Sequence, residues 1–345
     1  MVEVTVTGWA VTLGLIGALV AFDLWRSRRD PHAIGLREAA AWSAFYLAIA
    51  MLFGIAFALV AGWGPGGQYF AGYLVERSLS IDNLFVFVII MTTFAVPSAQ
   101  RARLLMLGIV GALVLRTAFI ALGAEMLDVF SPTYLIFGLA LIATGAQLFA
   151  HRDKDPSVSD NLVVTAAKRW LPVADRYDRH RLLTRTAGRR AFTPMALALL
   201  AIASTDVVFA LDSIPAVFGV TQHAYIVFAA NAFALLGLRP LFFLVSGLLD
   251  RLVYLSTGLA VVLAFIGAKL LLHFAHLYAE AVPEISTGAS LAVILVVLGV
   301  TTLASLIRSR RAPTMRAHPI RFRRRRRPTG STTANDAGRP DAQRA

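Results

Sequence analysis

Long apolar runs, separated by short polar connections, occupy most of the chain. A run of about 18 or more mainly apolar residues can cross a bilayer as a helix. The pattern therefore predicts an all-α polytopic membrane protein with about nine transmembrane helices. The expected spans cover roughly residues 4–25, 40–62, 71–95, 103–123, 133–150, 193–219, 224–247, 252–272 and 288–307.

The composition agrees with a membrane protein and excludes several kinds of chemistry. Of the 345 residues, 57% are hydrophobic and 15% are charged, whereas soluble domains are about 45–50% apolar and about a quarter charged. The sequence has no Cys, which excludes disulfides, thiolate metal ligands and thiol redox chemistry in it. We find no nucleotide-binding signature or protease motif, so we expect no enzymatic activity. No basic residues precede the first apolar run, so we interpret it as a mature span and not a cleaved signal.

The basic residues predict how the chain is oriented in the membrane. Lys and Arg follow the first, third, fifth and ninth expected spans, whereas connections 63–70, 124–132, 220–223 and 273–287 contain none. The positive-inside rule then predicts an outside N-terminus and a cytoplasmic C-terminus in the cell membrane. This orientation also explains the net charge of +13, so we do not expect nucleic acid as a partner.

The charge and hydropathy pattern divides the chain into five regions. Residues 1–39 form an N-terminal span and cytoplasmic loop, and residues 40–150 and 193–307 form two halves of a membrane domain. Between the halves lies a basic cytoplasmic loop, 151–192, and a disordered Arg-rich tail is expected over 308–345.

The basic loop and the tail suit anionic lipid headgroups. Residues 162–183 have loose helical spacing of apolar positions and a basic face, which is typical of a helix lying on the cytoplasmic leaflet. The arginine run at 321–327 could bind nucleic acid, but its cytoplasmic position favours lipid headgroups.

Two similar acidic segments lie inside expected spans. Span three carries Glu76 and Asp82, and span six carries Asp206 and Asp212, in each case six residues apart. A carboxylate deep in hydrocarbon costs roughly 2.5–3.5 kcal/mol, so such residues usually face the bundle interior and act on ions or protons. We therefore interpret the two segments as halves of one intramembrane site.

The expected orientation makes these segments an inverted repeat. Span three runs from outside to inside, and span six runs the opposite way. One span after each segment comes a similar motif with a central arginine, Arg116 in G-A-L-V-L-R-T-A-F and Arg239 in A-L-L-G-L-R-P-L-F. Paired segments of opposite direction predict the inverted-topology architecture that many secondary transporters share.

Helix geometry limits how the acids can be arranged. Six residues of α-helix rise about 9 Å and rotate about 240°, so the two acids of one span cannot share a face. Either the helices are broken near the site, or the acids act in two layers. In the layered case Glu76 should be level with Asp212, and Asp82 with Asp206. Pro215 is expected to free backbone carbonyls toward the site.

The polar groups of these segments are oxygen donors, which favour Mn²⁺, Ca²⁺ or Mg²⁺ over soft metals. Protons alone remain an alternative. Two arginines against four acids would leave about two negative charges, the charge that one divalent cation balances. The expected ion ligands are Glu76, Asp82, Asn83, Asp206, Asp212 and Ser213, with supporting residues Ser80, Thr205, Arg116, Asn231 and Arg239.

Structural roles compete with this interpretation. Glu76 and Arg77 could form an interfacial pair, and the other acids could simply pair with Arg116 and Arg239. For a further set of charged residues near span ends we expect a solvated interface; these are Asp23, Asp250, Arg251, Lys269, His273 and His276.

At these motifs the sequence resembles the TerC family, the TerC/Alx group of membrane proteins named for tellurium resistance. The resemblance rests on V-E-R-S-L-S-I-D-N-L-F-V-F (75–87), S-T-D-V-V-F-A-L-D-S-I-P-A-V-F (204–218) and N-A-F-A-L-L-G-L-R-P-L-F-F (231–243), and it covers roughly 40–307. It implies Mn²⁺ export or homeostasis, with a looser link to tellurite and alkaline stress. Carried over, it places Glu76, Asp82, Asn83, Asp206, Asp212 and Ser213 in the transport site.

The sequence thus favours a transporter with Mn²⁺ as the transported ion and no tightly bound cofactor. The alternative is a membrane scaffold that recruits stress-response or membrane-insertion partners through the 151–192 loop and the tail.

Overall fold

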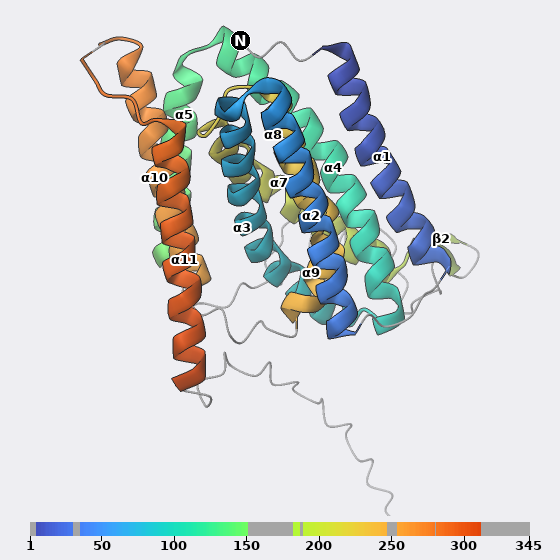
Figure 1. Ribbon diagram of the computed structural model, residues 1–345. Coiled ribbons are helices and arrows are strands. Elements are labelled where there is room, and N and C mark those ends of the chain that lie inside the picture. The colour runs from blue at the N-terminus through green and yellow to red at the C-terminus, as the bar shows by residue number, and fades with distance from the viewer. Residues whose placement is uncertain are drawn as a thin grey trace, which may run out of the picture.

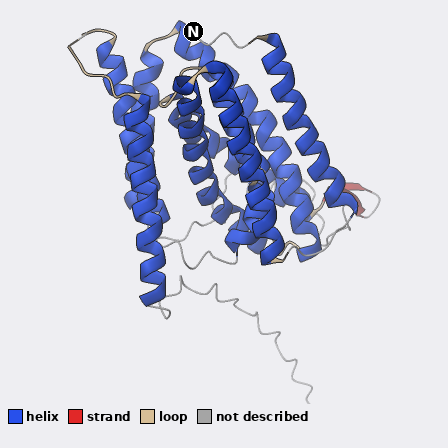
Figure 2. Ribbon diagram, viewed as in Figure 1, coloured by secondary structure: helices blue, strands red, loops and turns tan. Residues whose placement is uncertain are grey.

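The computed structural model is a bundle of long helices with one short β-hairpin (Figures 1 and 2). It describes residues 5–29, 35–150, 182–186, 189–246, 254–279 and 281–311. The expected all-α membrane fold is confirmed. The helices are α1 (Val6–Arg29), α2 (Leu36–Ala61), α3 (Trp63–Thr93), α4 (Ser98–Val129), α5 (Pro132–Ala150), α7 (Pro194–Phe218), α8 (Ala224–Leu236), α9 (Leu238–Ser246), α10 (Leu255–His276) and α11 (Thr287–Arg311).

Most of these helices could cross a bilayer. Within the described ranges, seven are long and apolar enough, and α8 with α9 makes an eighth if this pair, bent by 45°, is one span. The helix α3 is not among them, since Glu76, Arg77 and Asp82 interrupt its apolar run. The chain is therefore a multi-pass membrane protein, and the expected count of nine depends on whether α3 also crosses.

The connection between α2 and α3 differs from the expectation. Residues 63–70 were expected to form an outer connection, but α3 begins at Trp63, directly after Gly62. Gly62 has a φ of +96°, which a residue without Cβ adopts readily. Pro65 lies in the first turn of α3, where its missing N–H removes no helical hydrogen bond. One glycine thus makes the whole turn between the two helices.

Four helices, α3, α4, α7 and α8, form the centre of the bundle, with α3 packing on α7 and α8, and α4 packing on the same two. Helices α3 and α7 are antiparallel, because Gly72 faces Val217 while Glu76 and Ser213 both contact Arg116. The helix α4 is parallel to α7, since Gly108 and Gly123 face Ile202 and Phe218. Likewise α3 is parallel to α8, since Gly72 and Arg77 face Ala230 and Ala234.

The helices α5, α10 and α11 form a second group beside the centre, at the left of Figure 1. Helices α5 and α10 cross closely at glycines. A Cβ on Gly145 would lie 2.9 Å from the carbonyl oxygen of Ala260, and one on Gly267 would lie 2.7 Å from that of Gly138. Small residues let membrane helices approach in this way, and van der Waals packing then holds them together.

The β-hairpin lies at the end of the basic loop, just before α7. Strand β1 (Leu183–Thr186) pairs with antiparallel β2 (Arg189–Phe192), and Leu183 lies opposite Phe192. This hairpin was not expected from the sequence. The expected surface helix at 162–183 falls almost entirely outside the described residues, as does the tail beyond Arg311.

Candidate functional site

Arg116 joins three helices at the centre of the bundle. Its side chain is 1% exposed, in the middle of α4. The guanidinium donates to Glu76 of α3, to Ser213 Oγ of α7 at 3.1 Å and to Asp206 Oδ1 of α7 at 3.2 Å. Glu76 and Asp206 are buried as well. The two acidic segments are therefore brought together, as expected.

The periodicity of α7 explains which of its residues reach Arg116. Asp206 and Ser213 are seven residues apart, about two turns, so they lie on the same face. Asp212 points elsewhere and accepts a hydrogen bond from Thr144 Oγ1 of α5 at 2.9 Å. The expectation that Asp206 and Asp212 cannot share a face is confirmed. Both α3 and α7 are continuous helices, so the alternative of helices broken at the acids is wrong here.

The expected level of Glu76 agrees with the register of the two helices. Gly72 faces Val217 on antiparallel α7, so Glu76, four residues further along α3, is level with Ser213, the residue next to Asp212. The side chain of Asp212 nevertheless points away from Arg116, and Asp206 is the α7 acid that reaches it. The side chain of Asp82 lies outside the described part of the structure, so its expected level with Asp206 stays a prediction.

Several buried polar atoms of α3, α7 and α8 have no hydrogen-bond partner among the described residues. They include one carboxylate oxygen of Glu76, one of Asp206, and both amide atoms of Asn231 in α8. Buried polar groups are normally paired, and exceptions call for an explanation such as an ion or a water. Two carboxylates against one guanidinium also leave one negative charge. The site is therefore electrostatically suited to a cation.

The other expected ligands lie around this centre in different ways. Ser80 is fully buried and donates to Glu76 at 3.4 Å. Asn83 is buried one turn further along α3. Thr205 donates at 2.7 Å to the carbonyl of Ala201 in its own helix, which satisfies its hydroxyl there. Among the residues described, no three His, Cys, Asp or Glu side chains lie close enough together to hold a metal ion.

Arg239 does not support the acids, contrary to the expectation. It donates to Asp23 Oδ1 of α1 at 3.0 Å, and both side chains are buried. Asp23 was expected at a solvated interface, but it is 5% exposed because α1 packs against α8 and α4. The expected balance of two arginines against four acids is therefore wrong: Arg239 already has its own counter-ion.

Glu76 and Arg77 also do not form the interfacial pair that the sequence allowed. Glu76 is fully buried, whereas Arg77 faces the break between α8 and α9. Its guanidinium donates to the carbonyl of Ala234 at 2.8 Å, close to Gly237. Arg77 thus satisfies one of the carbonyls at the C-terminal end of α8, which have no helical donor. No pattern in the sequence indicated this role.

Comparisons with known proteins agree with the motifs. The model of the integral membrane protein TerC family matches residues 61–313. An uncharacterized membrane protein of Mycobacterium tuberculosis is 43% identical over 311 residues, covering 86% of this chain and 78% of its own. The thylakoid membrane protein TERC of Arabidopsis thaliana chloroplasts is 42% identical over 257 residues, covering 74% and 65%.

A third relative is named Alx, a candidate membrane-bound redox modulator of Escherichia coli. It is 36% identical over 273 residues, covering 76% of this chain and 85% of its own. No solved structure matches this chain.

Proposed function

This chain belongs to the integral membrane protein TerC family, and we propose that it exports a divalent cation, Mn²⁺, through the site that Arg116 organises. One observation carries the proposal. Two carboxylates from antiparallel helices, Glu76 and Asp206, meet in a buried centre, and each keeps one oxygen without a hydrogen-bond partner in the described part of the chain. Carboxylate, amide and hydroxyl oxygens are the ligands that Mn²⁺, Ca²⁺ and Mg²⁺ prefer.

In the proposed cycle Arg116 acts as a tethered cation. Its guanidinium neutralises one of the two carboxylates and holds Glu76 and Asp206 close together when no ion is bound. A divalent cation would bind the unpartnered oxygens of these acids together with the amide oxygen of Asn231. Asp212, which accepts a hydrogen bond from Thr144, would be the carboxylate that exchanges a proton for the cation. The proton gradient or the membrane potential would then drive export.

The packing of the bundle supports alternating access by an inverted repeat. An inverted repeat makes α3 equivalent to α7, and α4 equivalent to α8. With this pairing, the parallel neighbours α3 and α8 correspond to the parallel neighbours α7 and α4. The close crossing of α5 and α10 has the same symmetry. Gly145 of α5 contacts Ala260 of α10, and the equivalent contact from α10 joins Gly267 to Gly138 of α5. Transporters of this architecture rock one half against the other around a central site.

Cellular manganese measures the proposed activity directly. We expect a manganese-sensitive host that expresses the wild-type chain to contain less Mn by elemental analysis than a host with an empty vector. Glu76→Gln and Asp212→Asn should abolish this decrease, because the first removes a charged ion ligand and the second removes the carboxylate that exchanges the proton. Asp128→Asn is the matched control, since Asp128 is exposed at the end of α4 and should leave Mn export unchanged. Equal Mn contents in wild type and both site variants, all present in the membrane, would contradict the proposal.

The scaffold alternative acts through the cytoplasmic loop and tail. Removing residues 312–345 should leave Mn export intact if the membrane site carries the function. If the protein is a scaffold, the same deletion should abolish its phenotype although the membrane site is unchanged. The name of Alx suggests a redox role. Thiol chemistry cannot provide such a role in this chain, because its sequence contains no Cys.

A further inference from the structure

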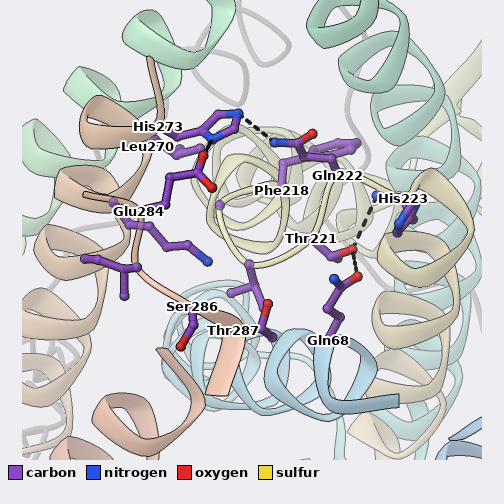
Figure 3. Close-up of a pocket in the computed structure, with 14 residues that line it drawn as sticks. Gln68, Phe218, Thr221, Gln222, His223, Leu270, His273, Glu284, Ser286 and Thr287 are labelled. Carbon is purple, nitrogen blue, oxygen red and sulfur yellow. Dashed lines mark hydrogen bonds and ion pairs between the residues drawn. The ribbon is translucent and has the colours of Figure 1, made fainter. Parts of the chain in front are cut away.

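A pocket of about 450 Å³ opens where α3, α7, α10 and α11 meet (Figure 3). It lies at the N-terminal end of α3 and the C-terminal end of α7, near the connection from α10 to α11. The segments that build it include 220–223 and 284–287, which belong to the connections that carry no Lys or Arg. By the positive-inside rule this end of the bundle faces outside.

The pocket wall is polar and carries both signs of charge. His273 bridges Gln222 at 2.8 Å and Glu284 at 2.6 Å through its two ring nitrogens. Figure 3 shows this chain of contacts on one side of the pocket, with Gln68 and Thr221 on another. Lys269 also lines the pocket and offsets the carboxylate of Glu284. One carboxylate beside one ammonium suits the passage of a hydrated cation better than its tight binding.

The floor of the pocket lies close to the carboxylate site. Phe218, which lines the pocket, is the last residue of α7 and is 1% exposed. Ser213, which binds Arg116, comes five residues earlier on the same helix, about 7.5 Å along its axis. Along α7 the two sites are therefore about one and a half helical turns apart.

The C-terminal end of α7 is tightly packed. A Cβ on Gly123 of α4 would lie 3.0 Å from the ring of Phe218, and one on Gly72 of α3 would lie 3.0 Å from Val217. The ring of Phe218 therefore packs directly against α4.

We propose that this pocket is the outer vestibule of the cation path and that Phe218 is the plug between the vestibule and the carboxylate site. The proposal rests on the proposed function for the identity of the ion. The arrangement of vestibule, plug and site can be tested without any transport.

The absence of Cys makes the full-length chain a ready background for accessibility measurements. Gln222→Cys places a thiol in the vestibule, Ser213→Cys places one at the site, and Thr93→Cys places one at the far end of α3. Intact cells are treated with a membrane-impermeant maleimide. We expect rapid labelling at position 222, slow labelling at 213 and none at 93, with position 93 becoming reactive once the cells are permeabilised.

The plug is tested by combining Ser213→Cys with Phe218→Ala. Labelling from outside should then rise about ten-fold or more, which corresponds to about 1.4 kcal/mol in the balance between closed and open forms. Phe218→Leu serves as a second variant if the alanine variant does not accumulate, and it should give a smaller increase. Thr93→Cys combined with Phe218→Ala should remain unlabelled.

Two results would overturn the proposal. An unreactive thiol at position 222 in intact cells means that the pocket is not an outer vestibule. Equal labelling at position 213 with and without Phe218, whether high or low, means that the ring is not the plug. Neither result depends on Mn export, whose loss in the site variants is measured separately, so the two proposals can fail independently.

Discussion

Arg116 and Arg239 occupy matching places in similar motifs, but their surroundings differ. Arg116 lies in the middle of a continuous helix, α4, and binds acids from α3 and α7. Arg239 is the second residue of α9, just after the break, and binds Asp23 of α1. A repeated motif therefore places a buried charge at equivalent positions, while the local backbone and neighbouring helices decide which partner neutralises it.

Two residue differences between the motifs explain why the helix is continuous at Arg116 and broken before Arg239. Gly237 stands where the first motif has Val114, and Pro240 stands where it has Thr117. Proline cannot donate a helical hydrogen bond, and it is tolerated best in the first turn of a helix. A new helix, α9, accordingly begins at Leu238, and the chain bends by 45°. The second arginine therefore lies in a separate short helix, where it donates to Asp23.

The largest expected effect comes from removing Arg116. Arg116→Gln leaves two buried carboxylates without their counter-ion, and breaking a buried ion pair in this way costs about 3–5 kcal/mol. We expect a large loss of thermal stability of the purified protein in detergent, together with loss of Mn export. Arg116→Lys should restore part of the stability because it keeps the positive charge, although an ammonium cannot make the bidentate hydrogen bonds of a guanidinium.

The matched control is Arg103→Gln, which makes the same change at an exposed position of α4. Exposed substitutions usually change stability by less than about 0.5 kcal/mol. If Arg116→Gln melted as Arg103→Gln does, Arg116 would not be the counter-ion that holds the site together.

A somewhat smaller effect is expected at Arg239. Asp23→Asn leaves one buried guanidinium unpaired and should destabilise the protein by about 3 kcal/mol. Asp23→Asn combined with Arg239→Gln should recover much of this loss, because neither partner then carries an unpaired charge. The double variant should still export Mn, since this pair contacts neither Glu76 nor Asp206. Thermal unfolding of the four forms gives the coupling energy of the pair.

Glu38→Gln provides the comparison for this pair. Glu38 pairs with Arg26 at 3.3 Å, but both side chains are partly exposed. Such pairs contribute about 1 kcal/mol or less. If the double variant at positions 23 and 239 lost Mn export while it remained stable, Arg239 would belong to the site after all.

Part of the arrangement around the two arginines could be predicted from the sequence. Apolar runs predicted the helices, and the cost of burying charge predicted that Glu76, Asp206 and Arg116 face the interior. The spacing of Asp206 and Asp212 predicted that they face different ways. All of these follow from local periodicity and from the energetics of one side chain in hydrocarbon.

Contacts between distant segments could not be predicted in the same way. Asp23 lies near the end of an apolar run, which is typical of a solvated residue, and only the packing of α1 buries it. Arg77 stands beside Glu76 in the sequence, yet neighbours on a helix point in different directions, and its partner is on α8. The bend at Gly237 had a signal in Gly237 and Pro240, but no motif indicates that Arg77 fills it.

The smallest expected effect concerns this bend. Gly237 has a φ of −89°, so its backbone would accept any residue, and the glycine is required only by close approach. A Cβ there would lie 2.8 Å from the guanidinium of Arg77 and 3.2 Å from Cβ of Tyr46. Gly237→Ala should therefore displace Arg77 from the carbonyl of Ala234. Losing a hydrogen bond from a charged donor costs about 1.5–3 kcal/mol, part of which Arg77 recovers by finding another acceptor.

Gly111→Ala is the control, because a Cβ at Gly111 of α4 would meet nothing within 4 Å. Alanine is favoured over glycine in a helix by up to about 1 kcal/mol, so this variant should be as stable as wild type or more stable. Thermal unfolding of both variants, and of Gly237→Ala with Arg77→Ala, separates the possibilities. If Arg77 holds the bend, Gly237→Ala costs less stability when Arg77 is already absent. An equal cost in both backgrounds would show that the bend depends on Tyr46 and the backbone, and that the two halves differ for reasons unrelated to Arg77.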